Sequence, residues 1–182
     1  MVTKNILILL LILLIVSSIN GNANSNPIEG KKTHTTELNM DIFSFLRQLE
    51  SNMPLTRQKI TDMGFELTKI EKGTFRDDYS APPMALNDGV RLRDITLSVR
   101  NVESGISLFL MINITNKTIT PQEMEKQLGG FAVLHFDGVI VSGKTITYAK
   151  EVGEFGIFAL YDQNGKDVLS NVSFTSVEPL EQ

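Results

Sequence analysis

Residues 90–114, VRLRDITLSVRNVESGISLFLMINI, contain the strongest strand pattern of the chain and decide its predicted fold. From residue 95 to residue 100, apolar and polar residues alternate, which is typical of a strand with one face in solvent. In residues 106–114, isoleucine and leucine line one face while Phe109 and Met111 lie on the other. This pattern indicates a central strand that is buried on both faces, joined to the first strand by a hairpin.

Two helices are expected before this hairpin. Asp41 is placed to cap a helix that ends before Pro54, and its apolar residues follow helical spacing. A second helix is predicted over residues 55–63, with Thr56 as its cap and Gly64 just after its end. A strand is then expected over residues 65–70.

A third helix is indicated by Thr120-Pro121-Gln122-Glu123, in which a capping Thr, a Pro at the first helical position and a Glu form a capping box. Gly129-Gly130 marks its end. Four strands are expected after it, over residues 131–136, 145–152, 155–161 and 168–174.

The two halves of the chain have similar order. Residues 56–65 (TRQKITDMGF) and 120–131 (TPQEMEKQLGGF) each contain a capping Thr, a Gln two residues later, two spaced apolar residues, glycine and phenylalanine. The predicted fold class is therefore α+β: an antiparallel sheet with helices packed on one face, built as a tandem duplication of a helix-plus-three-strand unit.

These two patterns give residues 40–175 a resemblance to the tandem α/β envelope modules of the β-lactamase-inhibitor-protein type and the outer-membrane-assembly lipoproteins. The resemblance implies a helix–helix–sheet form. The chain departs from both groups, because it has no cysteine for the disulfides of many such inhibitors or for a lipid anchor. The likeness concerns architecture and implies little about function.

The N-terminus has the pattern of a secretory signal peptide over residues 1–23: Lys4, an apolar run over residues 6–16, and small residues before a cut between Ala23 and Asn24. The alternative is an uncleaved membrane anchor, for which the run is short, because a spanning helix needs roughly 17–25 apolar residues. Residues 24–38 are expected to be a flexible leader, and residues 39–177 a single domain with pseudo-repeats at about 39–115 and 116–177.

Composition limits the location and the partners. A cysteine-free exported domain favours the bacterial periplasm over a eukaryotic secretory route, so the protein is expected to be periplasmic or secreted, with no membrane span after cleavage. Loss of Lys4 leaves 16 basic and 21 acidic side chains, a net charge of about −5. This charge, without basic runs, argues against nucleic acid as a partner.

Candidates for catalysis or metal binding are weak. His135 and Asp137 share a face of a predicted strand, which permits a base oriented by a carboxylate, but a hydrogen-bonded histidine near a turn is the simpler interpretation. Residues 76–78 (Arg-Asp-Asp) lack the ligand alternation of a calcium loop, and His34 has no supporting residues. No cofactor and no metal are expected.

The connection from Gly73 to Gly89 is the best candidate for a site, because long loops in compact domains are often functional. It contains the predicted binding residues Phe75, Tyr79, Met84 and Leu86 among charges, the composition of an interface anchor. The alternative is that these side chains cover the sheet.

The sequence therefore predicts an exported, non-enzymatic protein-binding module, whose partner is another protein of the envelope or extracellular space. It fits an inhibitor, an immunity-type protein or an envelope assembly factor. The main alternative is a small-ligand or lipid carrier that uses the sheet surface, for which the apolar residues on both faces of 106–114 are the reason. A hydrolase based on His135 and Asp137 is the remaining alternative.

Overall fold

The structure, a computed structural model, describes residues 35–73, 76–102, 105–133, 145–153, 155–162 and 168–179. All of them belong to one compact unit, Thr33–Gln182. The predicted signal peptide and its cleavage site at Ala23 and Asn24 lie outside the described residues, as does most of the predicted leader.

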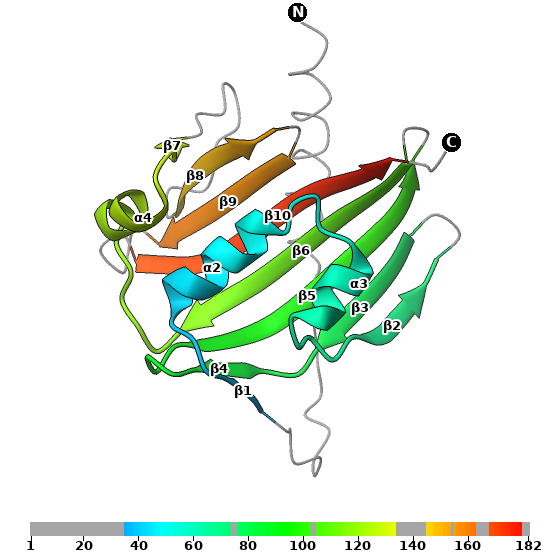
Figure 1. Cartoon of the computed structure of the whole chain (residues 1–182), viewed down its shortest axis with the longest axis horizontal. Coiled ribbons are helices and arrows are strands. Elements are labelled where there is room, and N and C mark those ends of the chain that lie inside the picture. Colours follow the sequence, from blue (N-terminus) through cyan, green and yellow to red (C-terminus); the bar gives the residue numbers. More distant parts are fainter. Residues whose placement is uncertain are drawn as a thin grey trace, which may run out of the picture. The chain divides into compact units, whose positions relative to one another are not determined.

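The described residues form ten strands and three helices (Figure 1). In chain order these are β1 (Thr36–Leu38), α2 (Ile42–Ser51), α3 (Arg57–Asp62), β2 (Thr68–Lys72), β3 (Arg76–Ala81), β4 (Met84–Leu86), β5 (Arg91–Val102), β6 (Gly105–Thr115), α4 (Pro121–Leu128), β7 (Ala132–Val133), β8 (Thr145–Val152), β9 (Phe155–Asp162) and β10 (Val168–Pro179).

All ten strands join one sheet. The order along it is β1-β4-β5-β6-β10-β9-β8-β7, and β3 pairs with both β5 and β2. The β1–β4 pair is parallel and the other pairs are antiparallel, so the sheet is mixed. The helices are short, with 10, 6 and 8 residues.

The predicted fold class, an α+β antiparallel sheet with helices and a helix-plus-three-strand repeat, is therefore wrong. The part of the protein that the structure describes is mostly a large mixed sheet of ten strands with few helices. In the sheet, β2, β3, β5 and β6 are antiparallel neighbours after α3, and β7 to β10 are antiparallel neighbours after α4. The short β4 lies between β3 and β5 in the chain.

Two segments account for the extra strands. The connection from Gly73 to Gly89 contains β3 and β4, which pair with successive parts of β5 and flank the turn residues Pro82 and Pro83. Thr36–Leu38, within the predicted leader, pairs with β4, and the Thr36 amide donates to the Pro83 carbonyl at 3.1 Å. Neither segment has the long alternation that marks β5, so tertiary pairing determines both strands.

The core lies between the helices and one face of the sheet. Leu92, Ile95 and Leu97 of β5 are all buried, although a regular strand would turn Leu92 and Ile95 to opposite faces. A β-bulge between Arg93 and Thr96, with Asp94 at φ +46°, adds one residue to β5. The apolar side chains on both sides of the bulge therefore point to the same face of the sheet.

The predicted helix caps are confirmed. The side chains of Asp41 and Thr56 accept backbone N–H bonds at the starts of α2 and α3, and Thr120 and Glu123 form both halves of the capping box of α4. Asp88 adds a contact from a distant turn, because its carboxylate accepts the Ile42 amide at 3.3 Å. Together Asp41 and Asp88 satisfy N–H groups that have no partner within the helix.

Figure 1 shows α2 and α3 in front of the central strands, so these helices share one face of the sheet. We call this the helix face and the opposite side the open face. On β6, Leu108, Leu110 and Ile112 are buried on the helix face, whereas Phe109 and Met111 on the open face are half-buried. Strand β6 is central as predicted, but it is fully buried on one face rather than two.

Candidate functional site: a pocket at the sheet edge

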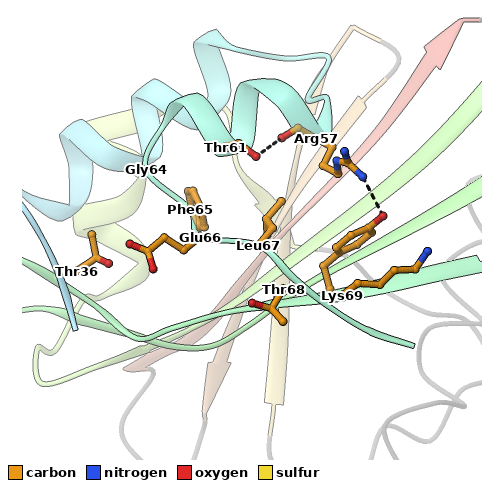
Figure 2. A pocket seen from close by; sticks show the side chains of 10 residues that line it. Thr36, Arg57, Thr61, Gly64, Phe65, Glu66, Leu67, Thr68 and Lys69 are labelled. Carbon is orange, nitrogen blue, oxygen red and sulfur yellow. Dashed lines mark hydrogen bonds between the residues drawn. The ribbon is translucent and has the colours of Figure 1, made fainter. Parts of the chain in front are cut away.

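An open pocket of about 900 Å³ lies where α3 meets the edge of the sheet (Figure 2). Its walls come from the first strand, from α3 and the turn that follows, and from the β2–β3 hairpin. The lining residues are Thr36, Arg57, Thr61, Gly64, Phe65, Glu66, Leu67, Thr68, Lys69 and Tyr79. The pocket therefore joins segments that are up to 43 positions apart in the chain, from Thr36 to Tyr79.

Tyr79 is held in a fixed position in the wall of this pocket. Its hydroxyl accepts a hydrogen bond from Arg57 Nη1 at 3.1 Å. The dashed line from the guanidinium of Arg57 in Figure 2 marks this bond. The Arg57 guanidinium carbon lies 5.5 Å from the ring centre and Lys69 Nζ lies 5.8 Å from it. Both distances are within the range of cation–π attraction. Two cations thus fix the ring before any ligand arrives, which lowers the entropic cost of binding.

Local sequence explains how this wall forms. Gly64 adopts φ +92°, a left-handed conformation that favours glycine, and so turns the chain out of α3. The following Phe65 is buried, and its ring lies 6.0 Å from that of Phe45 on α2. This aromatic contact anchors the extended residues before β2 beneath the helices, so that Glu66 and Thr68 remain exposed.

Strand β2 is the outer border of the site. Within the described part of the chain it pairs with β3 alone, so its other edge faces no strand. Thr68, Lys69, Ile70 and Glu71 are all exposed, and Ile70 is the most exposed large apolar residue described, at 61%. A β-bulge falls between Lys69 and Glu71. The backbone groups along such an edge are available to another chain.

The charges beside the hairpin are partly neutralised. Lys69 Nζ lies 2.6 Å from Asp77 Oδ2, and Arg76 Nη2 lies 2.7 Å from Asp78 Oδ2. The predicted charge run at residues 76–78 therefore makes ion pairs on both faces of β3. Among the described residues no carboxylate forms an ion pair with Arg57, whose side chain reaches the pocket.

The four predicted binding residues do not form one surface. Met84 and Leu86 are 1% and 5% exposed and belong to the core, where they cover the sheet. Tyr79 is 7% exposed but lines the pocket. Phe75 lies outside the described residues, as do His34, His135 and Asp137.

Sequence reasoning did not select Arg57 or Ile70. Arg57 resembles any exposed helix residue, and its role depends on Tyr79, 22 positions away. Ile70 falls on the same face as Glu66 and Thr68 in the predicted strand, where a single apolar residue is not unusual. The bulge beside it has no marker in the sequence. Within the described residues, no three His, Cys, Asp or Glu side chains are grouped to hold a metal ion.

Comparison with known proteins gives no relative: no family model, no curated protein and no solved structure matches this chain. None of the described helices is long and apolar enough to cross a membrane.

Proposed function

We propose that this protein is an exported protein-binding module without catalytic chemistry, and that its partner docks at β2 and the adjoining pocket. One observation supports the proposal above the others: a strand edge with four consecutive exposed residues, with which no strand of the described residues pairs, borders an open pocket. The partner protein is expected in the envelope or extracellular space. An inhibitor, an immunity-type protein and an envelope assembly factor all work by such surface complementarity.

The physical basis is strand addition. An extended partner segment forms main-chain hydrogen bonds with β2, which supply affinity, while its side chains enter the neighbouring pocket, which supplies specificity. Ile70 offers apolar area to bury, and Arg57 offers charged N–H donors close to Tyr79. The fixed Tyr79 ring gives a rigid surface, so little side-chain freedom is lost on binding.

The test is capture of partners by the tagged full-length protein from the envelope and secreted fractions of its own organism. Ile70→Arg places a long charged side chain on the β2 edge, and we expect it to abolish a stoichiometric partner seen with the wild type. Val133→Arg is the matched control, because Val133 is the other large exposed apolar residue described, at 41%, and lies on β7 at the opposite end of the sheet.

Arg57→Ala tests the pocket separately. It removes the donor to Tyr79, and we expect weaker capture with little change in melting temperature, because Arg57 is exposed. Equal capture by Ile70→Arg and Val133→Arg would show that the edge is not the docking site. A wild-type eluate without any partner would contradict the binding function itself.

A small-ligand or lipid carrier is the second candidate. Phe109, Met111, Phe158 and Leu160 are half-buried apolar side chains on the open face, and they favour contact with an apolar ligand. Solvent extraction of the purified protein followed by mass spectrometry tests this function. A ligand in a one-to-one ratio would support it, and an empty extract would count against it.

A further inference from the structure

The open face has an unusual charge distribution. Arg91 and Arg93 are exposed on either side of Leu92, which is fully buried on the helix face, so both arginines lie on the open face. Beyond the bulge, Arg100 lies three positions after the buried Leu97 and on the opposite side. Arg76 of β3 pairs with Arg100 in register. Four arginines therefore occupy the open face of two neighbouring strands.

The carboxylates nearest to these arginines in register are Asp78 and Asp94, whereas Glu71 on β2 and Glu151 on β8 lie on the same face but farther from β5. Asp78 is engaged by Arg76 at 2.7 Å and by the Ser98 hydroxyl at 2.6 Å, and Asp94 accepts from the Asn113 amide at 2.9 Å. Among the described residues, no carboxylate forms an ion pair with Arg91, Arg93 or Arg100. Like charges directly opposite in a sheet are destabilising, so the Arg76–Arg100 register adds a cost that an anionic ligand would relieve.

Apolar side chains lie on the same face as these arginines. Phe109 and Met111 of β6 pair in register with Ser98 and Thr96 of β5. Phe158 lies on β9, where a Cβ atom at Gly156 would come within 2.9 Å of its ring, so this ring covers the glycine. Arginine, methionine and aromatic residues are enriched in protein–protein interfaces relative to other surfaces.

We propose that the open face is a second interaction surface, which binds an acidic polypeptide segment of a partner protein. The segment's carboxylates would pair with Arg91, Arg93 and Arg100, and its apolar side chains would contact Phe109 and Met111. The chain as a whole has a net charge of −4. The broad charged surface of a membrane or a nucleic acid would be repelled by this overall charge, whereas a flexible polypeptide can approach the arginines alone, because screening limits interactions to about 10 Å.

The experiment is a calorimetric titration of the full-length protein with poly-L-glutamate at low ionic strength. The test variant is Arg91→Glu with Arg93→Glu. The matched control is Arg47→Glu with Lys126→Glu, which makes the same change in net charge at exposed positions of α2 and α4. We expect the test variant to bind about tenfold more weakly than the control, and wild-type binding to weaken with added salt.

Three results would overturn this proposal: no binding to the wild type, equal losses in the two double variants, or binding to phosphatidylglycerol vesicles without binding to poly-L-glutamate. The test is independent of the strand-edge function. Ile70→Arg is expected to retain wild-type affinity for poly-L-glutamate, so that failure at β2 and failure at the open face are distinguishable.

Discussion

The hydroxyl of Tyr161 is the clearest target for a stabilising substitution. Tyr161 on β9 is 0% exposed, and its hydroxyl has no hydrogen-bond partner among the described residues. A buried polar group without a partner costs about 1–3 kcal/mol. Tyr161→Phe removes that group and retains the ring, including its edge contact with Tyr148 at 5.2 Å. We expect a gain of about 1 kcal/mol, which raises the melting temperature by about 2–4 °C in a protein of this size.

The pH dependence gives a second measurement on the same variant. Burial raises the pKa of Tyr161 well above its usual value of 10.0, and Tyr148 and Glu123 add to the effect. Above pH 10 the unfolded chain therefore loses this proton while the folded chain retains it, so stability falls as the pH rises. Tyr161→Phe has no proton to lose, and its unfolding free energy is expected to fall less between pH 9 and pH 12.

Denaturant unfolding followed by circular dichroism measures both effects. Tyr148→Phe is the control, because this half-buried tyrosine lies beside Tyr161 and loses the same hydroxyl. Its unfolding free energy is expected to change by less than about 0.5 kcal/mol. A loss of 1 kcal/mol or more in Tyr161→Phe would refute the reasoning, since it would mean that the hydroxyl is hydrogen-bonded.

Three further substitutions test the helices and the core. Asp41→Ala removes the cap of α2 and should cost about 1 kcal/mol in the unfolding free energy, by denaturant titration. Burial raises the pKa of Asp88, but hydrogen bonds from Lys117 and from the Ile42 and Val90 amides outweigh burial and lower this pKa below 3.8. The ionised Asp88 therefore stabilises the wild-type fold, and this stabilisation is lost as the pH falls through the lowered pKa. Asp88→Asn should make the unfolding free energy depend less on pH in this acidic range. Leu97→Ala, at a fully buried position, should cost about 2–5 kcal/mol by the same titration.

Local structure was the part that sequence predicted well. The caps at Asp41, Thr56 and Thr120 were all correct, because capping depends on residues within three or four positions of each other. Strands β5 and β6 were also predicted within one or two residues, since each has a long alternating pattern. The short strands β3 and β4 were missed: residues 76–78 are all charged, and their pairing with β5 compensates for a weak strand pattern.

The candidate site was harder to predict for the same reason. Composition identified Tyr79, Met84 and Leu86 as unusual within a polar segment, but it could not separate exposed anchors from core residues. That distinction depends on the register of β3 and β4 against β5, which places Tyr79 opposite Leu97 and Met84 opposite Leu92. Both partners are fully buried, so the two side chains point to the core. A shift of one residue in that register would have exposed them.

The edge at β2 has features that restrict what binds there. A long, flat apolar edge would pair with any similar strand and lead to aggregation. On β2, Lys69 and Glu71 flank Ile70, and the bulge between them breaks the regular backbone spacing. A partner must therefore match both the charges and the irregular geometry, whereas an unrelated strand meets neither. These features oppose polymerisation and still permit a specific complex, which is why the proposed function depends on this edge rather than on the short β7 at the other end of the sheet.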